Sequence, residues 1–178
     1  MQKPLDRAPR HVTFRDVRET DFPLLFSLRR DIPLQALLLT VPPALDDAAL
    51  EAWIRTRQQE PGGLFQVVED ASAGDAIGFV QITQVHHRNR VGYAGVCLAA
   101  HARGRGLGQA TLRKLIDTSR DQLGLLKLMS EVRIDNFPAL RYNMVVGFHI
   151  VGTLKAHFVD AAGLRHDALL LECPLDQV

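Results

Sequence analysis

The chain has 178 residues, of which 47% are hydrophobic and 23% are charged. This length and composition predict one globular domain large enough to bury a hydrophobic core. The formal net charge is only +1, and no apolar run reaches the length of a membrane span, so we expect neither a nucleic acid nor a membrane as partner. We expect a single domain over residues 1–178, with residues 1–10 as a flexible extension.

The cysteine and histidine positions bear on the compartment and on metal binding. Cys97 and Cys173 stand far apart, each in an apolar run, which favours buried free thiols and a reducing compartment. Residues 1–10 lack the apolar stretch of a signal peptide. His86 and His87 are adjacent and would face opposite sides of a strand, which is a poor arrangement for a metal ion. The sequence predicts a cytoplasmic protein without a metal.

Hydrophobic periodicity and turn residues divide the chain into strands and helices. Strands are expected at residues 11–17, 64–69, 76–85, 91–98, 127–133, 149–159 and 165–173. Helices are expected from Thr20, as N-cap, to Arg30, after Asp46, after the glycines near 106, and at 137–146, with a short apolar segment at 33–39. This order predicts an α/β fold with a mixed, mostly antiparallel sheet of about seven strands and helices on both faces.

The most informative segment is residues 103–108, which read Arg-Gly-Arg-Gly-Leu-Gly and open directly into a helix. The glycines let the backbone turn tightly and approach a ligand without a Cβ in the way. The first turn of the helix adds unpaired N–H groups at the positive end of the helix dipole. Arg103 and Arg105 add positive charge, so this segment predicts an anion site, most naturally for a pyrophosphate.

Two common phosphate motifs do not fit this spacing. A mononucleotide P-loop needs a lysine that is absent after Gly108, and a dinucleotide fingerprint needs a different glycine spacing early in the chain. The pattern Arg/Gln-x-x-Gly-x-Gly/Ala does fit, at Arg103, Gly106 and Gly108. It resembles the acyl-CoA pyrophosphate loop of the GNAT family of N-acetyltransferases. A nucleotide-binding protein of another fold is an alternative only if the second motif, at residues 131–148, is a coincidence.

A second motif supports the same resemblance. The family carries a strand, then Asn-x-x-Ala, a helix and Gly-Phe, and here Asn136, Ala139, Gly147 and Phe148 stand at those places. The residues alone agree, because Asn136 is a good N-cap and Gly147 a left-handed helix stop. Residues 131–133, Glu-Val-Arg, followed by Asn136, also resemble the ribosomal-protein N-terminal acetyltransferase branch. The two motifs with their strands cover roughly residues 91–153.

The resemblance implies acetyl-CoA as cosubstrate, with no metal, in a single acyl-CoA N-acyltransferase domain with a GNAT-like fold. In the family, the strand before the loop pairs with the pantetheine as an added strand would, and the loop holds the pyrophosphate. These contacts map to Val96, Cys97, Leu98, Arg103, Gly104, Arg105, Gly106, Leu107, Gly108, Gln109, Asn136 and Asn143. Cys97 also suggests a nucleophile, but the family transfers directly, and a cysteine between Val96 and Leu98 fits a core position better.

The proton transfers have one candidate base and no assigned acid. Glu131 stands where the ribosomal-protein branch carries its proposed base, although a charged residue on the open face of a strand explains it equally well. The tyrosine that often acts as acid in the family is replaced by Asn143, which cannot donate a proton to a thiolate. Tyr142 is one place early, about 100° round the helix. Tyr93 or Tyr142 would have to serve instead, or the thiolate leaves without an acid.

The sequence therefore predicts an N-acetyltransferase that moves the acetyl group of acetyl-CoA directly to a primary amine of a small molecule or peptide. The alternative is a catalytically idle protein of the same fold that binds acyl-CoA as a sensor or interaction module, which the asparagine at position 143 favours. Residues 30–43 and the terminal hairpin should set the acceptor specificity. A homodimer is compatible with this assignment.

Overall fold

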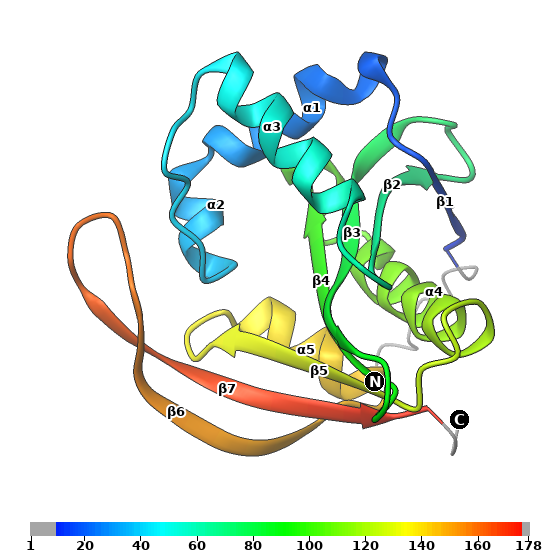
Figure 1. The fold of residues 1–178 in the computed structure, drawn as a ribbon, viewed down its shortest axis with the longest axis vertical. Helices are drawn as coiled ribbons and strands as arrows, with labels where there is room; N and C mark the ends of the chain where they lie inside the picture. Colours follow the sequence, from blue (N-terminus) through cyan, green and yellow to red (C-terminus); the bar gives the residue numbers. More distant parts are fainter. Residues whose placement is uncertain (1–9, 176–178) are drawn as a thin grey trace, which may run out of the picture.

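The computed structural model describes residues 10–175, and a seven-stranded sheet runs through it (Figure 1). The strands are β1 (Val12–Arg15), β2 (Leu64–Asp70), β3 (Ala76–His86), β4 (Val91–Leu98), β5 (Lys127–Arg133), β6 (His149–Val159) and β7 (Arg165–Pro174). The α-helices are α1 (Phe22–Arg30), α2 (Ile32–Leu37), α3 (Asp47–Gln58), α4 (Leu107–Asp121) and α5 (Phe137–Val145). Short 3₁₀ turns lie at Glu19–Asp21 and Ala100–Ala102.

The sheet is mixed and mostly antiparallel, as predicted. Its strand order is β1-β2-β3-β4-β5-β7-β6, and β4 with β5 is the one parallel pair among the described residues. The connection between these two strands is α4, which is the crossover that a parallel pair requires. The glycine-rich loop therefore lies at the carboxyl end of β4, where open sheets commonly bind ligands.

Helices cover both faces of the sheet because neighbouring residues of a strand point to opposite sides. On one face, α1, α2 and α3 pack against Phe79 of β3 and Cys97 of β4. On the other face, α4 and α5 pack against Val80 and Leu98, the next residues along the same strands. Figure 1 shows α1–α3 on one side of β3 and β4 and α4 on the other.

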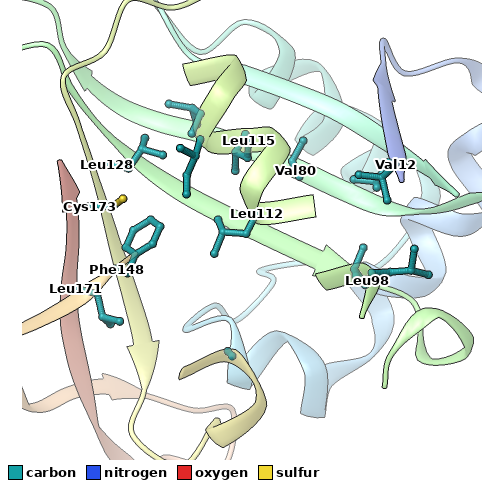
Figure 2. Packing of buried hydrophobic residues seen from close by; sticks show 14 of the residues in the cluster. Val12, Val80, Leu98, Leu112, Leu115, Leu128, Phe148, Leu171 and Cys173 are labelled. Carbon is teal, nitrogen blue, oxygen red and sulfur yellow. The ribbon is translucent and has the colours of Figure 1, made fainter. Parts of the chain in front are cut away.

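The larger core lies under α4. Leu112 and Leu115 project from this helix toward Val80 and Leu128 of the sheet, as Figure 2 shows. All four side chains are at most 2% exposed, so each contributes about 1.5–3 kcal/mol of burial free energy relative to an exposed position. The same cluster continues through Phe148, Leu171 and Cys173 to the distal strands. This packing fixes the start of α4 and with it the glycine-rich loop.

The first helix differs from the prediction. Thr20 is not an N-cap, because residues 19–21 form a 3₁₀ turn and α1 begins at Phe22, after Asp21. The Asp21 carboxylate instead accepts hydrogen bonds from Arg15 at 2.7 and 2.8 Å and from the Arg18 backbone at 2.8 Å. The short apolar segment after α1 forms the helix α2.

The structure bears on the predictions about residues 1–10 and about membrane spans only within the residues that it describes. The predicted extension at residues 1–10 falls almost wholly on residues 1–9, which lie outside the described part of the chain. Among residues 10–175, none of the helices is both long and apolar enough to cross a membrane.

Candidate functional site

The central feature of the site is a split between β4 and β5. Their parallel pairing covers only three residue pairs and ends at Tyr93 with Met129. Beyond that point β4 stays paired with β3 up to Leu98, and β5 stays paired with β7 up to Arg133. The β5-facing edge of residues 94–98 is therefore left open for an extended ligand, as at any sheet edge.

A pocket of about 220 Å³ occupies this split. Its lining includes Val96 and Cys97 from β4, Glu131 from β5, and Asn136 and Asn143 from the turn and helix that follow β5. Five of the residues predicted from the sequence therefore meet at one place. The pocket also reaches α1, α2 and α3, so it passes through the sheet from one helical layer to the other.

The glycine-rich loop has the backbone geometry that a phosphate site requires. Gly104 and Gly106 have φ values of +70° and +82°, which side-chain-bearing residues rarely adopt. A Cβ at Gly104 would meet nothing within 4 Å, so the loop is open on that side. Within the described residues, the amides of residues 104–109 donate to no protein acceptor, and the first amide bonded back to the loop is that of Ala110, to the Gly106 carbonyl. Free N–H groups at the start of a helix are suited to bind an anion.

The two loop arginines have protein partners. Arg103 donates from Nε to the Leu98 carbonyl at 3.0 Å, and Arg105 donates from Nη2 to the Asp70 carboxylate at 3.2 Å. Hydrogen bonds from Ser72, more than the charge of Arg105, hold the pKa of Asp70 below its usual range. Both arginines thus brace the loop, and phosphate contacts from their remaining N–H groups stay a prediction.

The turn after β5 is built as the sequence indicates. The Asn136 side chain caps α5 by accepting from the Ala139 amide at 3.4 Å, and it donates to the Leu37 carbonyl of α2 at the same distance. At the other end of α5, Gly147 has a φ of +110°, and the Phe148 amide donates to the Asn143 carbonyl at 3.1 Å. This is the closing pattern of a helix that ends on a left-handed glycine.

Asn143 and Tyr142 both line the pocket, although they are successive residues of α5. Asn143 is buried, and its Nδ2 donates to the Ala139 carbonyl at 2.8 Å while its Oδ1 has no partner within the described residues. A buried acceptor without a partner is costly, so this atom on the pocket wall is suited to accept a hydrogen bond from an N–H donor of a ligand. Burial raises the pKa of Tyr142 to about 12, which keeps its hydroxyl protonated at neutral pH.

Cys97 is confirmed as a core residue. Its side chain is 2% exposed and packs with Phe79 and the residues of α1–α3. Burial raises the pKa of its thiol to about 12, so almost no thiolate exists at neutral pH. The structure thus disfavours a nucleophilic role, as the sequence analysis does.

Glu131 points to the same face of the sheet as α1–α3, because its neighbour Val132 packs in the core under α4. Its Oε2 lies 3.0 Å from Nε2 of His157. His157 comes from β6, two strands away, and reaches Glu131 across β7 because β6 has a register shift between Leu154 and Phe158. Such an irregularity re-aims side chains. Sequence reasoning missed His157, since alternation gives no sign of where a strand will bulge.

The face of the pocket toward α1–α3 carries residues that the sequence analysis did not single out, although two of them lie within the segment 30–43 that it expected to set acceptor specificity. They are Arg29, Gln35, Thr40, Trp53 and Arg57. Two further wall residues, Leu39 and Gln84, have φ values of +57° and +51°. Side-chain-bearing residues in this strained conformation cluster at ligand sites. Their spacing in the chain gives no motif, because they come from three helices, one loop and the end of β3.

The described residues contain no group of three or more His, Cys, Asp or Glu side chains placed to hold a metal ion.

A comparison with protein families now decides the assignment. The family model described as acetyltransferase (GNAT) domain matches residues 11–149, which is most of the chain. The chain belongs to the GNAT acetyltransferase family. The match includes the split strands, the glycine-rich loop and the turn after β5, so the resemblance drawn from the two motifs is correct at the level of the family.

Individual relatives add detail about the fold. The L-amino acid N-acetyltransferase AaaT of Escherichia coli is 29% identical over 86 residues, which are 47% of this chain and 53% of AaaT, so the chain spans about half the length of that relative. The spermidine N-acetyltransferase of Vibrio cholerae in complex with CoA and spermine has a TM-score of 0.85 at 20% identity, over 93% of this chain and 96% of that chain. A chimera of Vibrio cholerae SpeG and hSSAT has a TM-score of 0.82 at 21% identity, over 94% and 97% of the two chains. These solved structures confirm the GNAT-like fold.

Proposed function

We propose that this protein is an N-acetyltransferase that moves the acetyl group of acetyl-CoA directly to the primary amine of a small molecule. The observation that carries the proposal is the open edge of β4, which ends at a loop of unpartnered amides and faces a carboxylate, Glu131, across the split. Membership of an acetyltransferase family supports the same activity. We also propose that residues 1–178 form one acyltransferase domain, in which the β6–β7 hairpin completes the sheet.

The residues fit acetyl-CoA in three places. The amides of residues 104–109 match a pyrophosphate, and the unpartnered Oδ1 of Asn143 matches an N–H donor. The edge of residues 96–98, which has no strand partner and on which the Leu98 carbonyl already accepts from Arg103, matches the two amides of a pantetheine. When bound, acetyl-CoA supplies an acetyl thioester that an uncharged amine attacks directly, so that the C–N bond forms as the C–S bond breaks.

The chain's own task is to orient the amine and remove its proton. An amine with a pKa near 10.4 arrives as an ammonium ion at neutral pH, so a base must accept one proton. Glu131 lines the pocket and is the base that we propose, and its contact with His157 gives the proton a route toward the more exposed hairpin. Tyr93 and Tyr142 both line the pocket, and Tyr142, whose hydroxyl is protonated at neutral pH, is the acid that we propose for the leaving thiolate.

The relatives named above do not agree on an acceptor. By their names they act on L-amino acids or on spermidine, and they give no support to the narrower resemblance to ribosomal-protein N-terminal acetyltransferases. That narrower resemblance rests on Glu131, Arg133 and Asn136 alone, and we do not extend it to a protein substrate. A homodimer likewise stays a prediction.

The direct test measures release of CoA thiol from acetyl-CoA with a panel of amino acids, polyamines, arylamines and short peptides. The proposal requires acetylation of at least one amine at a rate well above hydrolysis. Tight binding of acetyl-CoA without transfer to any amine would instead favour the idle acyl-CoA-binding protein. No binding of acetyl-CoA at all would contradict both functions.

A further inference from the structure

Arg29 is a guanidinium group on the pocket wall that has no acidic partner among the described residues. Its side chain is half-buried, and burial together with the nearby charge of Arg57 lowers its pKa. Buried charges in proteins are as a rule paired, because an unpaired one loses its hydration without compensation. An unpaired guanidinium at a ligand pocket therefore points to an anionic ligand.

The surroundings of Arg29 hold it in one orientation. Nη1 donates to Gln35 Oε1 at 2.6 Å and to Thr40 Oγ1 at 3.2 Å, which uses both of its hydrogens. Gln35 is 1% exposed and is itself fixed by donating from Nε2 to the Leu28 carbonyl at 2.9 Å. The guanidinium carbon lies 4.9 Å from the ring centroid of Trp53, so one face of the group is covered.

With Nη1 engaged, the N–H groups of Arg29 that are still free are those of its Nε–Nη2 edge, which has no protein acceptor within residues 10–175. Two parallel N–H groups on one edge match the two oxygens of a carboxylate. A second guanidinium, that of Arg57, also lines the pocket, and its nearest acidic partner, Glu60, is 3.7 Å away. The pocket lining contains these two arginines and a single carboxylate, Glu131, so it repels a cationic polyamine.

We propose that the acceptor carries a carboxylate as well as its amine, as an amino acid does, and that Arg29 binds this carboxylate through its Nε–Nη2 edge. Arg29, Arg57 and Glu131 all lie on the side of the split toward α1–α3, away from the glycine-rich loop. The carboxylate is thus held by Arg29, with Arg57 adding positive potential, while the amine is directed to Glu131. The inference rests on the proposed function and names its substrate class.

The first experiment compares matched acceptors. A panel of L-amino acids is assayed against the corresponding amino acid amides and decarboxylated amines, with spermidine as a polyamine, by release of CoA thiol. The free acids should have a kcat/KM about 30-fold or more above their amides, because an amide leaves the charge of Arg29 unpaired. Equal kcat/KM for acids and amides, or a preference for spermidine, would overturn the inference while leaving the acetyltransferase function intact.

The second experiment tests Arg29 itself. Arg29→Gln should raise KM for the free acids by about 30-fold or more and change kcat/KM for the amides by less than about threefold. Arg29→Lys, which keeps the charge but not the planar edge, should recover part of the loss. Arg57→Gln should have a smaller effect of the same kind, whereas Arg55→Gln, a solvent-exposed arginine of the same helix that pairs with Glu51, should have none.

Binding measurements separate the remaining outcomes. The acetyl-CoA dissociation constant should be the same in Arg29→Gln and in the unaltered protein. A large loss of acetyl-CoA affinity in the variant would show that Arg29 binds the cosubstrate instead, which would overturn the inference. If no acceptor is acetylated, an amino acid should still raise the melting temperature in the presence of CoA, and Arg29→Gln should abolish that rise. Absence of any such rise with the whole panel of free acids would also overturn the inference.

Discussion

On the α4 side of the split sheet, the glycine-rich loop after β4 presents backbone amides that have no protein acceptor among the described residues. On the α1–α3 side, the pocket is bounded by side chains from α1, α2, α3, β3 and β5 and from the loop after α2. In the function that we propose, the first surface binds an anion through the peptide backbone, and the second through Arg29 and Arg57. Backbone recognition needs a fixed order of glycines along the chain, so it leaves a motif. Side-chain recognition needs only proximity in space, so each acceptor preference can arise from different residues on the same fold.

The largest expected effect comes from removing the carboxylate in the split. Glu131→Gln should lower the acetylation rate about 10²- to 10⁴-fold near neutral pH with little change in acetyl-CoA affinity. The loss should shrink as the pH rises, because the amine then arrives already deprotonated. Glu172→Gln is a matched control, since Glu172 also lies 3.0 Å from a histidine, His149, but does not line the pocket. Near-full activity of Glu131→Gln at pH 7 would leave proton removal to water.

The next effect tests the backbone surface. Acetyl-CoA at 100 times its dissociation constant should stabilise the protein by about 2.7 kcal/mol, and Gly106→Val should abolish this gain because a side chain would stand between backbone and phosphate. Valine at a φ of +82° is also strained, by about 1–3 kcal/mol, so the unliganded variant will be less stable. Gly163→Val, at the same φ of +82° in the β6–β7 turn, controls for that strain. A ligand-induced gain that persists in Gly106→Val would exclude the loop as the pyrophosphate site.

A smaller effect concerns the histidine behind the base. His157→Gln should lower the acetylation rate about tenfold and flatten its pH dependence, because Glu131 would lose a partner that can carry the proton onward. His149→Gln removes the equivalent partner of Glu172 and should leave both the rate and its pH profile unchanged. Identical pH profiles for His157→Gln and the unaltered protein would limit His157 to a structural role.

The smallest effect on activity is expected from replacing Cys97 of β4. Cys97→Ala should retain transfer, since the thiol is protonated and the neighbouring backbone is unchanged. The free energy of unfolding of Cys97→Ala should differ from that of the unaltered protein at alkaline pH. In the folded protein the thiol keeps its proton up to about pH 12, whereas the exposed thiol of the unfolded chain ionises near pH 9, so between these values the unfolded chain binds fewer protons and rising pH favours unfolding.

The measurement is the free energy of unfolding as a function of pH. The unaltered protein should lose up to about 1.4 kcal/mol per pH unit in this window through Cys97, and Cys97→Ala should lose correspondingly less. Tyr142, whose pKa is also raised to about 12, contributes in the same direction above pH 10 in both proteins. Equal slopes for the two proteins would mean that the thiol is not held protonated.

The sequence by itself was sufficient for the order of strands and helices along the chain, the glycine-rich loop and the capped helix after β5, because each depends on residues close together in the chain. Alternation defines a strand within a few residues, the glycines of the loop are needed for local φ values, and Asn136 caps the helix that follows it directly. Only the tertiary structure decided that β4 and β5 separate after Tyr93 and that a shift in β6 turns His157 toward Glu131. It also decided that Arg29 lies at the pocket wall with no acidic partner among residues 10–175. Glu131 and His157 are 26 positions apart in the chain, and Asn136 and Leu37, which are also hydrogen-bonded, are 99 positions apart. The packing of the two helical layers on the twisted sheet brings such residues together.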